Sequence, residues 1–352
     1  MGRLGAGGRR LVLACGVAAG MATAGAAHAQ LTVTPAGAAD GFALNNFVTG
    51  LPSDATYDPQ GAGPFGVTVN NAGQVVLDSY ANSTNYLFND VSNQTVANAI
   101  GSTLFKGFTS AYATVGGTVW GSGGSLFSNT AADTLIKFNP DGTVNTVYST
   151  VDVSNGLWVN PVNGHLIGSG YSGLVDIDPA NPAAYRVIGT NIADGVDGVA
   201  VSADGTTAYG ATPTGITAYD LTTGAGTVIA TIADPDGVGV ISSSNALDGD
   251  IVVNTNDGNV YLIDPTNISA GPLLVADNGS RGDYVSQDSN DGSLFLTQSD
   301  SVLKLSCGLG CSFAQAPPPV TPAPEPASLT VIGSALLGLG LMRRRRGFYV
   351  SE

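Results

Sequence analysis

One short segment recurs six times along the middle of this chain, and no other feature constrains the fold as strongly. Each copy has the apolar pattern of a strand, and five of the six end in Asn or Asp. The copies are Tyr86–Asn89, Ile136–Asn139, Val175–Asp178, Thr217–Asp220, Tyr261–Asp264 and the degenerate Val302–Ser306. Their last residues lie 50, 39, 42, 44 and 42 residues apart. The chain is therefore built from one supersecondary unit repeated at a nearly regular interval.

An interval of this length is typical of a four-stranded blade of a β-propeller. The fourth unit shows the pattern most fully, because Asp204-Gly205 supplies a tight turn between its first two strands. Its predicted strands, from inner to outer, are Gly198–Val201, Thr207–Gly210, Ile216–Asp220 and Val228–Ala230. Further turns of this kind are predicted at Asp141-Gly142, Asp257-Gly258 and Asp291-Gly292. We therefore predict an all-β, six-bladed β-propeller of four-stranded antiparallel blades over residues 30–312.

The last unit lacks an outer strand, because little chain remains between Ser306 and a proline-rich stretch. A spare strand is present before the first unit, at Ala43–Val48. We predict that this segment pairs into the last blade and closes the ring, since a closed ring leaves no open sheet edge.

Two cysteines, Cys307 and Cys311, follow the last predicted strand. In an oxidising compartment they can form a short-loop disulfide that fixes the end of this strand. Free thiols are the alternative, and a metal site would need further ligands that the neighbouring sequence does not supply.

The acidic residues of the chain are almost all Asp, and every Asp lies between Asp40 and Asp300. The 352 residues carry a formal net charge of -15, and Glu occurs only at Glu325 and Glu352. Asp bonds its own backbone in turns whereas Glu favours helices, so this usage indicates a turn-rich β protein. Such an acidic body repels phosphate backbones, which excludes a nucleic-acid partner, and it attracts divalent cations or cationic groups.

Residues 1–29 have the three parts of a signal peptide. Arginines come first, an apolar run spans Leu11–Ala26, and Ala27-His28-Ala29 forms a small-x-small cleavage site before Gln30. We therefore expect the protein to be exported. A retained membrane anchor is the alternative, which the Gly and Ala content disfavours, and the pair Arg9-Arg10 leaves the choice between general secretory and twin-arginine export open.

The other end of the chain shows ordered parts of its own. Residues 313–323 form a Pro-rich linker, which favours an extended spacer. The motif Pro324, Glu325 and Pro326 comes next, then a hydrophobic helix at residues 329–342, the cluster Arg343, Arg344, Arg345 and Arg346, and a tail at 347–352. The apolar run is short against the roughly 20 residues of a transmembrane helix, and the arginines would hold its end in the cytoplasm. A plain C-terminal membrane anchor is the alternative.

This order of motif, short helix and basic cluster resembles the PEP-CTERM sorting signal over residues 324–346. The resemblance implies a Gram-negative bacterium that makes exopolysaccharide, and an exosortase-type protease that recognises Pro324, Glu325 and Pro326. It also implies transient anchoring in the inner membrane, then a place in the cell envelope or outside the cell. The repeats over residues 42–306 resemble six-bladed propellers of the NHL and lactonase-like kind, which implies the fold rather than the activity.

Few residues offer catalytic chemistry. His165 is the only histidine after the signal peptide, and it lies beside a predicted hairpin turn, where a surface histidine is the alternative to a general base. The lactonase-type site that the resemblance suggests contains a Glu, and the repeat region has none. Trp120 and Trp158 form a sugar-binding platform if exposed on one face, or else fill the blade cores. We assign no catalytic residue.

Four predicted inner strands begin at a polar residue, and equivalent positions of a closed propeller converge on one mouth of its axial channel. These residues are Asn155, Asp197, Asp236 and Asp283. Their oxygens suit Ca²⁺, a hard cation that takes several oxygen ligands. The alternative is that each side chain caps its own turn by bonding the local backbone.

These patterns favour an exported binding or structural module of the envelope or extracellular matrix, linked to exopolysaccharide or biofilm. Its expected partners are the exosortase-type protease, glycans and other envelope proteins. A lactonase-like propeller hydrolase or lyase is one alternative function, and a passive spacer without a specific ligand is another.

Overall fold

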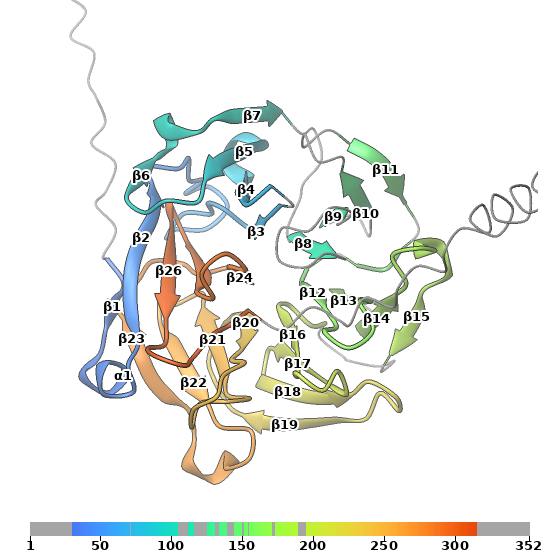
Figure 1. The fold of residues 1–352 in the computed structure, drawn as a ribbon, viewed down its shortest axis with the longest axis vertical. Helices are drawn as coiled ribbons and strands as arrows, with labels where there is room; N and C mark the ends of the chain where they lie inside the picture. The colour runs from blue at the N-terminus through green and yellow to red at the C-terminus, as the bar shows by residue number, and fades with distance from the viewer. Residues whose placement is uncertain are drawn as a thin grey trace, which may run out of the picture.

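A computed structural model describes residues 30–70, 72–104, 112–115, 125–130, 134–138, 144–149, 151–153, 155–170, 173–188 and 195–314. Within these residues, six small sheets surround a common axis (Figure 1). Their innermost strands contact one another in a closed circuit, in which each blade touches the next. The predicted β-propeller is therefore confirmed.

Each blade is a sheet whose strands follow one another from the axis outward. The first contains β3 (Val67–Val69), β4 (Gln74–Ser79), β5 (Thr84–Asn89) and β7 (Gly101–Leu104), and the second β8 (Tyr112–Val115), β9 (Ser125–Thr130), β10 (Thr134–Phe138) and β11 (Val144–Tyr148). The third contains β12 (Leu157–Val159), β13 (Leu166–Gly170), β14 (Gly173–Ile177) and β15 (Arg186–Ile188), and the fourth β16 (Val199–Val201), β17 (Thr207–Thr212), β18 (Gly215–Asp220) and β19 (Gly226–Ala230). The fifth contains β20 (Pro235–Val240), β21 (Ile251–Thr255), β22 (Val260–Ile263), β23 (Leu273–Asp277) and the outermost β1 (Thr32–Val33). The sixth contains β24 (Val285–Gln287), β25 (Leu294–Gln298), β26 (Ser301–Ser306), β2 (Ala43–Thr49) and β6 (Gln94–Thr95).

Five short helices lie between strands in the part of the chain that the structure describes. They are α1 (Pro35–Ala39), η1 (Tyr80–Asn82), η2 (Val96–Asn98), η3 (Pro182–Ala184) and η4 (Ile268–Ala270).

The six repeated segments coincide with the third strand of each blade. The four strands predicted for the fourth unit are present, and Asp204-Gly205 joins the first two. Asp141-Gly142 lies outside the described residues.

The ring closes where the sequence predicts. Strand β2 pairs antiparallel with β26, from Ala43 opposite Ser306 to Thr49 opposite Ser301, and the two strands run side by side in Figure 1. Phe47 of β2 is fully buried and packs edge-on against Phe88 of the first blade and Phe295 of the sixth. The closing strand therefore contributes both main-chain hydrogen bonds and an aromatic core contact that joins the two blades.

Two outer strands are not predicted by the repeat pattern. Strand β1 pairs with β23 at the edge of the fifth blade, and β6 pairs parallel with β2 at the edge of the sixth. Both have only two residues, too few to show a periodic pattern.

At the end of β26, a disulfide joins Cys307 to Cys311, which is the pairing expected from their spacing.

None of the helices among the described residues is both long enough and apolar enough to cross a membrane. The predicted signal peptide at 1–29, most of the linker at 313–323, the hydrophobic helix at 329–342 and Arg343 to Arg346 lie outside the described residues.

Glycines let the inner strands approach one another closely at one end of the ring. Gly156 and Gly198, each one residue before an inner strand, donate their N–H groups to the carbonyl oxygens of Asp197 (3.1 Å) and Asp236 (3.0 Å) in the next blade. A Cβ atom on Gly198 would lie 2.0 Å from the Asp236 oxygen, which no side chain can occupy. Neighbouring blades are thus joined by backbone contacts that require glycine.

We predict that Gly198→Ala lowers the free energy of unfolding by about 2 to 3 kcal/mol, because the new methyl group forces two backbones apart. Chemical denaturation measures the change. Gly101→Ala is the matched control, since its Cβ would meet Leu87 at an ordinary 3.7 Å. Equal stability of the two variants would contradict the close approach.

Candidate functional site

A charged cluster lies at the end of the ring where the inner strands begin. Its carboxylates come from three successive blades and from the loop between β2 and β3, and one guanidinium lies among them. We name the set Asp58, Asp197, Asp236, Asp283 and Arg281 the axial cluster. Asp197 and Asp283 each stand two residues before an inner strand, and Asp236 is the second residue of β20.

Arg281 holds the axial cluster together through three carboxylates. Its Nε donates to Asp283 Oδ1 at 2.7 Å, and its Nη1 donates to Asp58 Oδ2 at 3.0 Å. Its Nη2 lies 3.9 Å from Asp236 Oδ2. Only 14% of the Arg281 side chain is exposed, so these charges interact with little screening by solvent.

The hydrogen bonding of the axial cluster is incomplete. Asp283 is 7% exposed, and its Oδ2 atom is buried without a hydrogen-bond partner. Asn256, whose side chain bonds Asp236, has a buried and unpartnered Oδ1 atom as well. A buried polar atom without a partner costs about 1 to 3 kcal/mol, so both acceptors favour a donor from a ligand.

Burial raises the pKa of three carboxyl groups of the axial cluster. Burial raises the pKa of Asp283 to about 6 although Arg281 opposes the shift, and burial followed by the charges of Asp197 and Asp283 raises the pKa of Asp236 well above its ordinary value. Desolvation raises the pKa of Asp197 to about 6 as well. Its side chain is nevertheless open to solvent, so protein surrounds Asp197 without covering it, and screening by water weakens its contribution.

An aromatic group lies beside the axial cluster. Residues 50–66, which we name the cover loop, carry Tyr57, and this side chain is 55% exposed. The Arg281 guanidinium lies 5.7 Å from the centre of the Tyr57 ring. Tyr57 packs edge-on against Tyr80 at 5.0 Å, and Phe65 stacks on Tyr80 at 4.9 Å. The cover loop therefore places an exposed aromatic ring, which packs against Tyr80, next to the carboxylates of the axial cluster.

The ring axis is crossed by a tyrosine that follows the axial cluster in the chain. Tyr284, the residue after Asp283, is 5% exposed, and its hydroxyl donates to the carbonyl of Leu157 at 2.9 Å. Leu157 belongs to the third blade, on the other side of the axis from β24 (Figure 1). This hydrogen bond joins the sixth blade to the third across the axis.

The four residues predicted to bind Ca²⁺ have different surroundings. The Nδ2 atom of Asn155 donates to the carbonyl of Val196 at 3.1 Å, in the loop before the inner strand of the next blade and not in its own turn. The three Asp residues interact electrostatically, and the cation among them is the Arg281 guanidinium. Calcium binding at Asn155, Asp197, Asp236 and Asp283 stays a prediction.

Among the described residues, one group of three carboxylates has its ligand atoms within 4.8 Å of one another, and it lies elsewhere. This group is Asp90, Asp288 and Asp291, in the turns at the opposite end of the blades. Lys304 Nζ contacts all three, at 2.5 Å for Asp90 and 2.9 Å for Asp291, and is 8% exposed. The lysine already supplies the charge that a metal would bring.

Two other candidates lie away from the axial cluster. His165 follows a turn at the far end of the third blade, where its Nδ1 lies 2.7 Å from Asp176 Oδ1, so it belongs to a surface ion-pair group with Arg186. Trp158 is 3% exposed and fills the core, and Trp120 lies outside the described residues.

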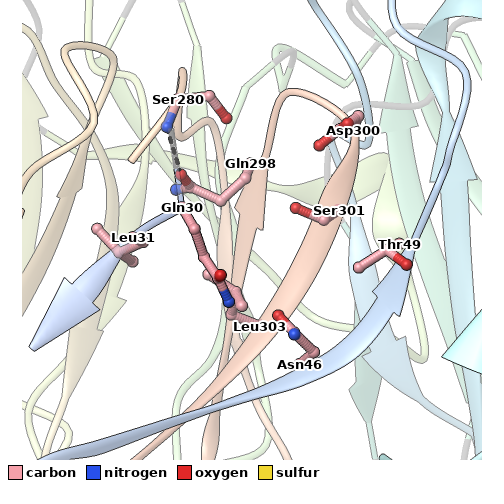
Figure 2. A pocket seen from close by; sticks show the side chains of 9 residues that line it. All are labelled: Gln30, Leu31, Asn46, Thr49, Ser280, Gln298, Asp300, Ser301 and Leu303. Carbon is pink, nitrogen blue, oxygen red and sulfur yellow. Dashed lines mark hydrogen bonds between the residues drawn. The ribbon is translucent and has the colours of Figure 1, made fainter. Parts of the chain in front are cut away.

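A separate pocket of about 200 Å³ lies between the closing strand and the start of the described chain (Figure 2). It is lined by Gln30, Leu31, Asn46, Thr49, Ser280, Gln298, Asp300, Ser301 and Leu303. Gln298 is engaged inside the protein, because its Oε1 accepts from Ser280 N at 2.8 Å and its Nε2 donates to the Thr297 carbonyl. With this side chain already bonded, the pocket offers less unmet hydrogen bonding than the axial cluster.

Sequence reasoning identified Asp197, Asp236 and Asp283 but missed Arg281, Asp58 and Tyr57. One signal was available for Arg281, since it is one of only four cations between Asp40 and Asp300 and stands two residues before Asp283. Asp58 and Tyr57 lie in a loop without periodicity, so no pattern marks them.

We predict that the free energy of unfolding rises as pH falls from 7.5 to about 5. Carboxyls with a raised pKa bind protons more tightly in the folded chain, so their stabilisation is present at low pH and lost as pH rises through 6 and 7. Asp250, with a pKa raised by burial to about 7, and Asp288, at about 6, add to the trend. Thermal denaturation across this range measures it.

Below about pH 4 we expect the opposite slope. Hydrogen bonds lower the pKa of Asp54, Asp204, Asp220 and Asp264, whose stabilisation is lost as they become protonated. Asp236→Asn should reduce the dependence between pH 5 and 7.5 and stabilise the protein at pH 7.5, whereas Asp204→Asn should leave this range unchanged. A stability that falls steadily from pH 7.5 to 5 is incompatible with buried carboxyls of raised pKa.

Comparison with known proteins bears on the fold. No family model matches the chain, and no curated protein sequence matches it. Among solved structures, the chain is similar to a gluconolactonase of Xanthomonas campestris, with a TM-score of 0.56 and 16% sequence identity. The match covers 78% of this chain and 94% of that one. At this identity the similarity shows a shared propeller fold.

Proposed function

We propose that this chain is an exported carbohydrate-binding propeller of the cell envelope or extracellular matrix, and that its axial cluster is the binding site. Carboxylates accept hydrogen bonds from sugar hydroxyls, and Asp58, Asp197, Asp236 and Asp283 gather them at one place. An exposed aromatic ring packs against the apolar face of a sugar, and Tyr57 is positioned for that contact.

The observation that carries the proposal is the unpartnered Oδ2 atom of Asp283 beside an exposed aromatic ring. The fold leaves a buried acceptor unsatisfied within a cluster that Arg281 and Asn256 otherwise bond. Ligand hydroxyls would supply the missing donors. Carboxylates beside one exposed aromatic ring suit a sugar unit, which has both hydroxyl groups and an apolar ring face.

Export and sorting form the second part of the proposal. The signal peptide at 1–29 directs the chain out of the cytoplasm, and the motif at Pro324, Glu325 and Pro326 presents it to an exosortase-type protease. The disulfide between Cys307 and Cys311 supports this assignment, because disulfides persist in oxidising compartments. The linker at 313–323 then separates the propeller from the membrane segment.

A propeller hydrolase is the alternative function. Its support is the fold shared with a gluconolactonase, together with Asp197 and Asp283, whose pKa values near 6 suit a general base. Against it stand the distance of His165 from the axial cluster and the lack of Glu in the repeat region. Hydrolysis of glucono-lactone that Asp197→Asn abolishes would favour the enzyme.

We predict that Tyr57→Ala weakens binding to glycans by about tenfold, which corresponds to the 1 to 2 kcal/mol of an aromatic stacking contact. A glycan array identifies the ligand, and calorimetry on wild type and variant measures the loss. Tyr57→Phe keeps the ring and should keep most of the affinity. If Tyr57→Ala binds as tightly as wild type, the axial cluster is not the binding site. An array without signal would reject the carbohydrate function.

We predict that the mature protein, isolated from its own cells, begins at Gln30 and ends before Arg343. Mass spectrometry of the intact protein and of its terminal peptides reads both ends. Replacement of Pro324, Glu325 and Pro326 by Ala should leave the N-terminal cleavage intact and stop the C-terminal one. A wild-type chain that still carries Arg343 to Arg346 outside the inner membrane would refute the sorting proposal.

A further inference from the structure

The axial cluster has more carboxyl groups than the fold supplies cations for. Four carboxylates surround one guanidinium, so up to three negative charges remain when all of them ionise. The other cations of the described residues are engaged or distant: Lys304 contacts Asp90, Asp288 and Asp291, Arg186 contacts Asp176, and Lys137 lies in the second blade. No ion pair within 4.0 Å links any of them to the axial cluster.

The N–H donors of Arg281 contact only some of these carboxylates. Nε and Nη2 contact Asp283, Nη1 contacts Asp58, and Asp236 lies at the 3.9 Å limit. Asp197 forms no ion pair with any described residue, although its side chain is open to solvent. The carboxylate that a ligand reaches first is therefore also the one that lacks a cation.

A comparison within the molecule shows what a satisfied cluster looks like. At the opposite end of the ring, Lys304 touches all three neighbouring carboxylates and lies over the rings of Phe47 and Phe295 at 5.7 and 5.2 Å. The axial cluster repeats these parts, with several carboxylates beside the aromatic ring of Tyr57. Among the described residues, no cation contacts Asp197 or the buried Oδ2 of Asp283.

We propose that the ligand of the axial cluster is an amino sugar with a free, protonated amine, such as a unit of a polymer of glucosamine. This inference rests on the proposed carbohydrate-binding function and names its substrate class. The ammonium donates to Asp197 and Asp283 Oδ2, the hydroxyls bond Asp236 and Asn256, and Tyr57 lies beside the cation and the ring. A neutral sugar leaves the charge uncompensated, and an acidic sugar is repelled.

The spacing of the carboxylates favours an ammonium over a metal. Calcium binds oxygens at about 2.3 to 2.6 Å, which requires its ligand atoms to lie close together. Asp197, Asp236 and Asp283 do not form a group whose ligand atoms all lie within 4.8 Å of one another. A sugar spreads its donors over several atoms, so its ammonium can donate to two of these carboxylates at about 2.7 to 2.9 Å while a hydroxyl group reaches the third.

Three hexasaccharides with the same β-1,4 backbone test the inference, made of glucosamine, of N-acetylglucosamine and of glucose. Calorimetry at about pH 6 in the presence of EDTA should show the glucosamine hexamer binding at least about tenfold more tightly than the other two, at one site for each chain. Asp197→Asn, at an exposed position that leaves the core intact, should reduce this preference to about twofold or less. Asp204→Asn removes the same charge from an exposed turn at the other end of the blade, and it should keep the preference.

The outcomes separate this inference from the proposed function. If all three hexamers bind equally and Tyr57→Ala loses this binding, the site does not recognise the amine. That result would overturn this inference and keep the proposed carbohydrate site. No binding of any hexamer would overturn both. If Asp204→Asn reduces the preference as much as Asp197→Asn does, the glucosamine hexamer is attracted to the acidic surface in general. If binding appears only with CaCl₂, the cation at the site is a metal. Either result overturns the inference.

Discussion

The pairing of β2 with β26 is the contact on which the rest of the structure depends. It joins residues that are about 260 positions apart in sequence, yet the entropy of closing a loop grows only with the logarithm of its length. Main-chain hydrogen bonds and the burial of Phe47 between two blades offset that cost. The same strand leads directly into the cover loop, so closure of the ring also brings Tyr57 and Asp58 to the axis. A site assembled from several blades exists only once the ring is closed.

The Asp-Gly pair has two unrelated uses in this fold, which explains why sequence patterns reach only part of the site. In Asp204-Gly205, the glycine has φ +69° and forms a hairpin turn, while the Asp accepts hydrogen bonds within that turn. In Asp197-Gly198, a Cβ atom on the glycine would collide with the backbone of the next blade, and the Asp belongs to the axial cluster. The dipeptide is identical in both cases. Only its place before or after the inner strand separates a turn from a site.

The sequence was sufficient for the elements that repeat. The third strands and the blade order follow from a local pattern that recurs six times, because each blade has to bury the same faces against its neighbours. The closing strand follows from the outer strand that the last unit lacks. The two-residue strands β1 and β6 were missed, since their pairing depends on where a distant edge lies. Arg281 was missed for a related reason: its role comes from carboxylates of three blades and one loop, and these converge only in three dimensions. The end of the strands at which Asp197, Asp236 and Asp283 gather was predictable, whereas the cation between them was not.

The two charged clusters of the propeller show how the same chemistry serves stability in one place and binding in another. Lys304 is buried among carboxylates that it contacts directly, so the fold itself supplies the cation there. Arg281 reaches Asp283 and Asp58, while Asp236 lies farther away, Asp197 faces solvent and Asp283 Oδ2 has no partner. Burial raises the pKa values of Asp197, Asp236 and Asp283, so ionising these three groups at neutral pH costs stability. A bound ammonium would lower those pKa values and recover that free energy as binding affinity. The cost of ionising Asp197, Asp236 and Asp283 and the capacity of the axial cluster to bind a cation are therefore one property of the same carboxylates.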